Sequence, residues 1–203
     1  AGNVALNISA LGSAARLVGI VGDDEPGAEL ASRLTAAGVL CDFFKCGGKP
    51  TITKLRVISQ HQQLIRADFE QSFATEDSFG LLDKAKNHVV GARAMVLSDY
   101  AKGALQDIES LISLGRKHRI PVVVDPKGKN FDKYRGATLI TPNFDEFEAV
   151  VGRCANEVDL VNKGSELVER LELEAVLITR GEQGMTLIIP CSPRAVSYTH
   201  LTL

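Results

Sequence analysis

The sequence has 203 residues, with 23 basic and 25 acidic side chains, and 45% of its residues are hydrophobic. This composition is typical of a folded globular domain and excludes a disordered chain. The near balance of charge argues against binding to nucleic acid or to a membrane surface through bulk charge. No apolar run approaches the roughly 18 residues that a membrane-spanning helix needs, and no signal peptide is visible.

The chain begins at Ala1 without a methionine, and we expect both of its ends to be cut edges. The four cysteines, none of them in a CxxC pair, are Cys41, Cys46, Cys154 and Cys191. None of the four histidines has metal-ligand spacing from them. Reduced thiols are typical of a cytoplasmic protein, which is the localisation we expect.

The predicted elements begin with a helix over residues 3–11 and a strand over 16–21. A second helix begins at the acidic segment 23–25, followed by Pro26, and ends at Gly38. The segment 41–68 has no helical period. Short strands at 43–44, 51–59 and 62–67 without helices between them predict a small antiparallel sheet, which we expect to form a lid over about 41–68.

From Thr75 onward, predicted helices and apolar strands alternate. We expect helices at 75–88, 104–117, 143–150 and 157–171. The expected strands are 94–97, 121–124, 138–141, 175–179 and 185–189. This alternation predicts an α/β fold with a largely parallel sheet.

Four of these strands run directly into polar segments, at 98–103, 125–128, 141–146 and 179–184. One such segment alone would be a helix cap or a turn. Four in succession favour a ligand site, because ligands bind beyond the carboxyl ends of parallel strands.

The residue types in these segments suit a phosphorylated, nucleotide-like ligand. Lys102, Lys127 and Arg180 are cations for phosphate oxygens. Asn143 and Glu146 could hold a hydrated Mg²⁺ or a phosphate through it. The sequence lacks a G-x-x-x-x-G-K-[ST] loop and a G-x-G-x-x-G fingerprint, which disfavours P-loop and dinucleotide-binding enzymes.

The strand-rich segment 51–68 alternates in a way that puts Lys54 and Arg56 on one face and Leu55 on the other. Arg66 and Asp68 also share a face. Two interpretations remain open: a solvated sheet surface, or a lid whose basic face reaches an anionic substrate and excludes water from phosphoryl transfer.

Several motifs together resemble the ribokinase (PfkB) family of sugar kinases. They are, in chain order, the segments 2–7, 19–24, 125–127, 141–146 and 179–184, which read GNVALN, GIVGDD, DPK, TPNFDE and TRGEQG. Segments 50–57, 62–66, 97–105 and 134–138 look more narrowly like the kinase domains of bifunctional heptose enzymes. The resemblance covers about residues 1–190, and we expect 191–203 to be a tail without family character.

The resemblance implies a ribokinase-like three-layer α/β sandwich with a mostly parallel central sheet and a small β-sheet lid. It implies ATP and Mg²⁺, and transfer of phosphate to O1 of D-glycero-β-D-manno-heptose 7-phosphate for lipopolysaccharide core synthesis. It also implies a homodimer formed through the lid, with a small sugar phosphate rather than nucleic acid or a membrane as the partner.

The resemblance further implies roles for particular residues. The expected nucleotide-binding residues are Lys127, Asn143, Phe144, Asp145, Glu146, Thr179, Arg180 and Gly181, with Glu146 reaching Mg²⁺ through water. The expected sugar-phosphate-binding residues are Gly2, Asn3, Lys54, Arg56, Arg66, Asp99 and Lys102.

Two departures from the family pattern accompany these matches. The acidic residue that holds the sugar hydroxyls in the family, and the Gly-Ala-Gly-Asp whose Asp is the catalytic base, have no counterpart in this sequence. We therefore expect the chain alone to be inactive and assign no catalytic residue. The alternatives are another ribokinase-like sugar or nucleoside kinase, and a non-catalytic nucleotide- or sugar-binding module.

Overall fold

The computed structural model describes residues 1–59, 62–69, 71–73, 75–190 and 196–198. The chain divides into two compact units. Unit 1 comprises Ala1–Ala85 and Lys102–Gln106, and unit 2 comprises Lys86–Ala101 and Asp107–Leu203. Both units combine helices with strands, so the predicted α/β class is confirmed.

Unit 1 begins with α1 (Gly2–Ala10), β1 (Ala15–Gly22), α2 (Glu25–Ala36) and β2 (Val39–Cys46). Helix α2 begins where the sequence predicts, because the Asp24 side chain accepts a hydrogen bond from the Gly27 N–H and a proline follows in the first turn. Ala5, Leu34 and Val39 are buried together between these helices and strands.

The first part of the expected lid was assigned wrongly. Residues 41–46 lie in β2, which pairs in parallel with β1 along its whole length, from Ala15 opposite Val39 to Gly22 opposite Cys46. Helix α2 is the crossover between the two strands, and a crossover of this length produces parallel pairing. The sequence pattern did not indicate this parallel pairing, because β2 is followed by further strands and not by a helix.

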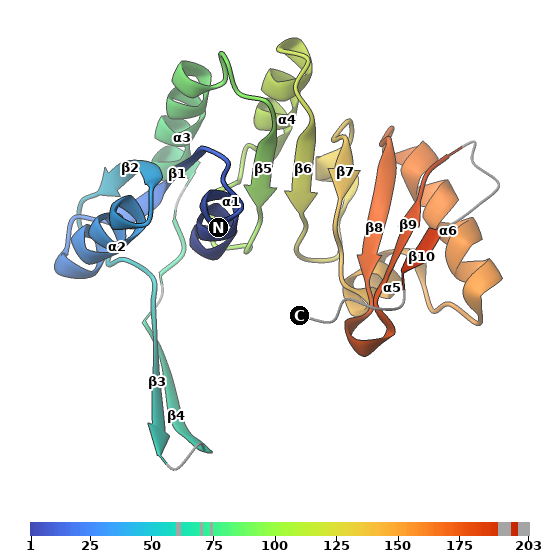
Figure 1. Ribbon diagram of the computed structural model, residues 1–203, viewed down its shortest axis with the longest axis horizontal. Coiled ribbons are helices and arrows are strands. Elements are labelled where there is room, and N and C mark those ends of the chain that lie inside the picture. Colours follow the sequence, from blue (N-terminus) through green and yellow to red (C-terminus); the bar gives the residue numbers. More distant parts are fainter. Residues whose placement is uncertain (60–61, 70, 74, 191–195, 199–203) are drawn as a thin grey trace. The chain divides into compact units, whose positions relative to one another are not determined.

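The remaining part of the lid is the antiparallel hairpin of β3 (Thr53–Ser59) and β4 (Gln62–Phe69). Lys54 lies opposite Asp68, and Arg56 lies opposite Arg66, so the predicted sharing of a face is confirmed. Figure 1 shows this hairpin as a two-stranded arm extending from the rest of unit 1.

The root of the hairpin is tied to the turn between β1 and α2. Asp24 accepts hydrogen bonds from the Thr51 hydroxyl at 2.6 Å and from the Thr51 N–H at 2.7 Å. The Gly22 N–H donates to the Thr51 oxygen at 2.9 Å. The Thr51 hydroxyl, followed by its N–H, holds the pKa of Asp24 below its ordinary value. Asp24 therefore anchors the start of the arm as well as capping α2.

Unit 2 contains a six-stranded sheet in the order β10-β9-β8-β7-β6-β5 (Figure 1). The strands are β5 (Met95–Ser98), β6 (Val122–Asp125), β7 (Leu139–Ile140), β8 (Ala175–Thr179), β9 (Met185–Ile188) and β10 (Val196–Tyr198). Strands β5 to β8 are parallel, whereas β9 and β10 each pair antiparallel. The mostly parallel sheet predicted from the sequence is confirmed.

The helices of unit 2 are α4 (Ile108–Lys117), α5 (Phe144–Val151) and α6 (Glu157–Arg170), and α3 (Thr75–His88) runs along the chain from unit 1 into unit 2. Helix α4 begins four residues later than predicted, because the Asp107 side chain caps it by accepting from the Ser110 N–H. Strand β10 falls in the segment that was expected to be a tail without family character. The rest of that segment, 191–195 and 199–203, lies outside the described residues.

The core of unit 2 is built from strand residues and the inner faces of its helices. Side chains with almost no exposed surface include Val124, Ile140, Ile178, Ile112, Phe147, Val168, Phe131 and Tyr134. Within the part of the chain that the structure describes, no helix has the length and apolar character needed to cross a membrane.

Replacement of Gly103 by Ala tests the packing of the segment that follows β5. Gly103 has φ +91°, and a Cβ there would lie 2.2 Å from the Phe73 carbonyl oxygen, a backbone atom that a side-chain rotation cannot move away. We expect Gly103→Ala to lower the free energy of unfolding by about 3 kcal/mol or more, measured by urea denaturation.

The matched control is Gly12→Ala in the same unit. Gly12 has a similar φ of +80°, but nothing lies within 4 Å of its would-be Cβ. Gly12→Ala should lower the free energy of unfolding by only about 1–2 kcal/mol, which is the cost of a left-handed backbone conformation for alanine. Equal losses in the two variants would show that the Phe73 contact does not limit position 103.

Candidate functional site

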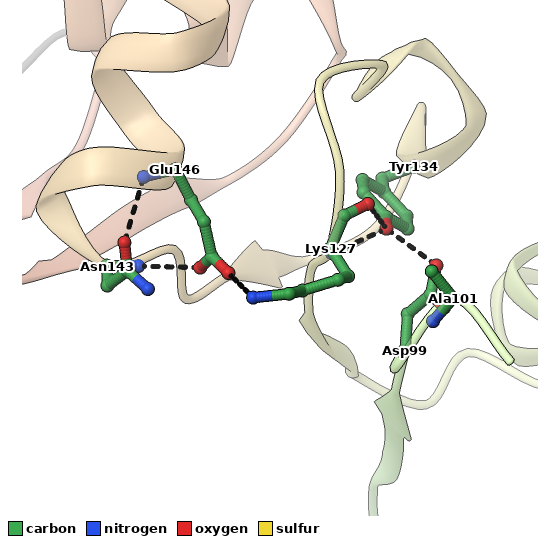
Figure 2. Close-up of polar contacts among 6 residues, drawn as sticks. All are labelled: Asp99, Ala101, Lys127, Tyr134, Asn143 and Glu146. Carbon is green, nitrogen blue, oxygen red and sulfur yellow. Dashed lines mark hydrogen bonds and ion pairs between the residues drawn. The ribbon is translucent and has the colours of Figure 1, made fainter. Parts of the chain in front are cut away.

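Asn143 and Glu146 form the start of α5, directly after β7. The Asn143 side chain accepts from the Glu146 N–H at 2.8 Å, and the Glu146 carboxylate accepts from the Asn143 N–H at 3.1 Å. This capping box satisfies two N–H groups at the end of the helix where the dipole favours anions (Figure 2). The expected nucleotide-binding pair is therefore held rigidly at the carboxyl edge of the sheet.

Lys127 lies in the loop after β6 and reaches the same carboxylate. Its ammonium lies 2.6 Å from Glu146 Oε1, and the hydrogen bond from Lys127 to Glu146 raises the pKa of the lysine. Lys127 and Asn143 thus both contact the Glu146 carboxylate (Figure 2). All three residues were expected to bind the nucleotide. Lys127 remains fully charged at neutral pH and suits phosphate oxygens.

Thr179 and Arg180 lie beside this cluster at the end of β8. Thr179 forms a parallel bridge with Asn143, and its N–H donates to the Pro142 carbonyl at 3.0 Å. The Arg180 guanidinium lies over the Phe144 ring, 5.7 Å from its centroid, and makes two hydrogen bonds to Glu157 at 2.6 and 3.0 Å. Arg180, the cation expected to bind phosphate, therefore contacts α5 and α6 in this structure.

Asp99 follows β5 and is the most buried carboxylate of the site, with 5% of its side chain exposed. It accepts from the Ala101 N–H at 2.8 Å, the Lys133 ammonium at 2.6 Å and the Tyr134 hydroxyl at 2.8 Å. Burial alone would raise the pKa of Asp99, but these three donors outweigh it and the pKa lies below its ordinary value. Asp99 is therefore an ionised, strongly held carboxylate.

The other residues expected to bind the sugar phosphate lie in unit 1. Gly2 is the first residue of α1, and the exposed Asn3 follows it. The carbonyl oxygen of Lys102 accepts a hydrogen bond from the Phe73 N–H at 3.0 Å. Of the remaining nucleotide residues, Asp145 and Gly181 are exposed at the starts of α5 and of the short 3₁₀ turn η2 (Gly181–Gln183).

The hairpin carries the three cations that the sequence assigned to the lid. Lys54 lies 3.3 Å from Asp68, and Arg66 donates to both oxygens of Asp68 at 3.0 Å. These contacts, first the hydrogen bond from Arg66, lower the pKa of Asp68. Arg56 faces Arg66 across the ladder, so two like charges lie directly opposite each other. Such a pairing is unfavourable unless an anion lies between the charges.

Sequence reasoning missed three partners of these side chains: Lys133 and Tyr134 beside Asp99, and Glu157 beside Arg180. Lys133 and Tyr134 are 34 and 35 residues from Asp99, so no local spacing links them. The one available signal was that a carboxylate at a buried strand end requires donors.

Mg²⁺ fits this site only as an ion held through water. Among the described residues, no three His, Cys, Asp or Glu side chains cluster in a way that could hold a metal. The Glu146 carboxylate accepts from Asn143 and pairs with Lys127, and a carboxylate has about four acceptor positions. Glu146 therefore retains the capacity to accept from a metal-bound water.

The pfkB family of carbohydrate kinases matches residues 1–196. The chain belongs to this family. The expected kinase class is confirmed, and the family acts on sugars with phosphate transfer.

Curated relatives agree over nearly the whole chain. The chain is 61% identical over 188 residues to the "Bifunctional protein HldE" of Hahella chejuensis, covering 93% of this chain and 39% of that protein. Proteins of the same name from Pseudomonas savastanoi pv. phaseolicola and Yersinia enterocolitica are 56% and 52% identical, over 94% and 95% of this chain and 40% of each relative. The chain therefore spans about two fifths of the length of these relatives.

Solved structures support the fold. Phosphofructokinase-2 from Escherichia coli superposes with a TM-score of 0.79 at 20% identity, covering 99% of this chain and 66% of that one. Ribokinase from Giardia lamblia gives 0.76 at 16% identity, covering 96% and 63%. The ribokinase-like fold predicted from the sequence is confirmed.

The ionised Asp99 gives a pH-dependent prediction. A carboxylate whose folded pKa is depressed stabilises the fold above its unfolded pKa, near 3.9, and loses that contribution as the pH falls through the folded value. We expect Asp99→Asn to lower the free energy of unfolding at pH 7 by about 2 kcal/mol. The difference from wild type should shrink as the pH falls below about 4.

The measurement is chemical denaturation of both proteins from pH 3 to pH 7. Asp132→Asn is the control, because this carboxylate is 69% exposed and its nearest cation, Arg170, is 4.0 Å away. A difference between wild type and Asp99→Asn that stays constant over the whole range would contradict the ionised assignment.

Proposed function

We propose that the chain is the sugar-kinase part of an enzyme that phosphorylates D-glycero-β-D-manno-heptose 7-phosphate at O1 with ATP. The observation that carries the proposal is the 52–61% identity to proteins named bifunctional HldE over nearly the whole chain. The motif resemblance to the kinase domains of bifunctional heptose enzymes points to the same substrate. The heptose 1,7-bisphosphate formed would serve lipopolysaccharide core synthesis in the cytoplasm.

The basic face of the hairpin supports a phosphorylated acceptor. Within the described strands β3 and β4, the charged side chains are Lys54, Arg56 and Arg66, which are basic, and Asp68, which is acidic. A phosphate dianion between Arg56 and Arg66 would convert the unfavourable like-charge pairing into a favourable one. A neutral sugar would leave that repulsion in place.

Lys127, Asn143, Phe144, Glu146 and Thr179 would hold the nucleotide. Lys127 would exchange part of its contact with Glu146 for the transferred phosphate, and Glu146 would accept from a water on Mg²⁺. Mg²⁺ would neutralise charge on the phosphates during in-line transfer. Asp145, Arg180 and Gly181 complete the proposed nucleotide side, with Arg180 holding the Phe144 ring in place.

We also propose that Gly2, Asn3, Asp99, Lys102 and the hairpin cations each contribute to binding the sugar phosphate. Because no Asp of this chain matches the base of the family, we propose that the chain alone turns over slowly or not at all. Tests of activity therefore use the complete gene product.

The substrate proposal predicts selective turnover of heptose 7-phosphate. Isothermal titration and a coupled assay should show tighter binding and faster turnover with heptose 7-phosphate than with ribose. Arg66→Gln should raise the KM for heptose 7-phosphate at least tenfold, the loss expected from one charge-assisted contact.

Arg33→Gln is the matched control, since the exposed Arg33 lies on α2, outside the hairpin, and pairs with the exposed Glu29. It should leave the KM unchanged. Tighter binding of ribose than of heptose 7-phosphate would overturn the substrate assignment and favour another ribokinase-like kinase. Binding without turnover in the complete gene product would favour a binding module.

The apolar face of the hairpin supports a homodimer. Val57 and Ile65 lie opposite each other and are 42% and 61% exposed, and Leu55 and Phe69 on the same face are 51% and 56% exposed. Such a surface suits a second copy of the same hairpin. The fold neighbour phosphofructokinase-2 from Escherichia coli has a tetrameric inhibited form.

We expect wild type to sediment as a dimer and Ile65→Glu to sediment as a monomer in analytical ultracentrifugation. Leu11→Glu is the control, because Leu11 is an 85% exposed leucine outside the hairpin. A monomeric wild type, or an Ile65→Glu variant that stays dimeric, would contradict pairing through this face.

A further inference from the structure

Tyr134 begins the segment 134–138, to which the sequence analysis assigned no site role, yet its hydroxyl contacts two segments of the site. It is the last residue of the short 3₁₀ turn η1 (Asp132–Tyr134), and its side chain is fully buried. Its ring meets the ring of Phe131 edge-on, with centroids 5.5 Å apart. A fully buried aromatic ring in this position would pack equally well as phenylalanine, so the hydroxyl requires a separate explanation.

The hydroxyl joins two strand ends. It donates to Asp99 Oδ2 at 2.8 Å, after β5, and it accepts from the Lys127 N–H at 2.9 Å, after β6. Burial raises the pKa of Tyr134 and the donors around Asp99 lower the pKa of that carboxyl, so the proton stays on the phenol. The phenol is therefore the donor to Asp99 at 2.8 Å, and its other acceptor, the Lys127 carbonyl oxygen, lies farther away at 3.2 Å.

The connection continues from Lys127 to α5. The Lys127 N–H position is set by Tyr134, and the ammonium of the same residue lies 2.6 Å from Glu146. Glu146 in turn holds the Asn143 N–H. Figure 2 shows this line from Asp99 through Tyr134 and Lys127 to Glu146 and Asn143. A single phenolic oxygen thus lies between the carboxylate proposed for the sugar side and the groups proposed for the nucleotide side.

We propose that Tyr134 is a positioning residue that couples Asp99 to the Lys127 loop and so places the Lys127 ammonium for the phosphates of the nucleotide. The inference rests on the proposed function, because it assigns Lys127 to the nucleotide. Tyr134 touches no reacting atom. It acts by fixing the Lys127 backbone, which would otherwise be free to carry the ammonium away from the phosphate position.

The test is Tyr134→Phe in the complete gene product, which removes the oxygen and keeps the ring. We expect the dissociation constant for MgATP, measured by isothermal titration, to rise about fivefold, the effect of one net hydrogen bond. The dissociation constant for heptose 7-phosphate should change less than twofold. In a Lys127→Ala background, Tyr134→Phe should have no further effect on MgATP binding, because the group that it positions is gone.

Phe131→Leu is the matched control for packing. Phe131 is 1% exposed and contacts the Tyr134 ring, but it has no hydroxyl. This variant should lower the thermal midpoint without the MgATP-selective effect. If Tyr134→Phe lowers only the thermal midpoint, or weakens MgATP equally in the Lys127→Ala background, the proposal is overturned.

The binding measurements separate an error in the proposed function from an error in the role of Tyr134. A wild type that binds no MgATP would overturn the proposed function and the role of Tyr134 together. A wild type that binds MgATP but not heptose 7-phosphate would overturn only the sugar assignment. Binding of MgATP that Tyr134→Phe leaves unchanged would overturn only the role of Tyr134.

Discussion

Strands β5 to β8 are parallel, and this one constraint determines where the polar residues of unit 2 gather. Parallel strands present all their carboxyl ends at one edge, so the segments after β5, β6, β7 and β8 meet there. Each segment supplies a different group: Asp99, Lys127, Asn143 and Thr179. Antiparallel pairing of any of these four strands would have sent its polar residues to the opposite edge.

A cluster of charges at such an edge is stable only if the charges satisfy one another. Asp99 is neutralised by Lys133 and accepts from Ala101 and Tyr134, and Lys127 pairs with Glu146. These mutual contacts satisfy the buried and half-buried charges and hold the side chains at the strand ends in fixed positions.

Unit 1 carries an exposed hairpin, β3 and β4, whose position has to be fixed by contacts at its base. None of the described side chains on its two faces, one basic and one apolar, is buried, so the placement of the hairpin depends on its root. Asp24 supplies that anchor by accepting three hydrogen bonds, two of them from Thr51. The carboxylate that starts α2 thus also fixes the point from which the hairpin extends.

The sequence by itself determined the alternation of helices and strands, the polar strand ends, the basic face of the hairpin and the family. These features depend on local periodicity and short motifs, as at Asn143 and Glu146, which lie three residues apart. It could not determine that β2 pairs with β1, or that Tyr134 joins Asp99 to Lys127. Only the tertiary structure decided these contacts, because the donors and acceptors of a buried carboxylate can come from any part of the chain.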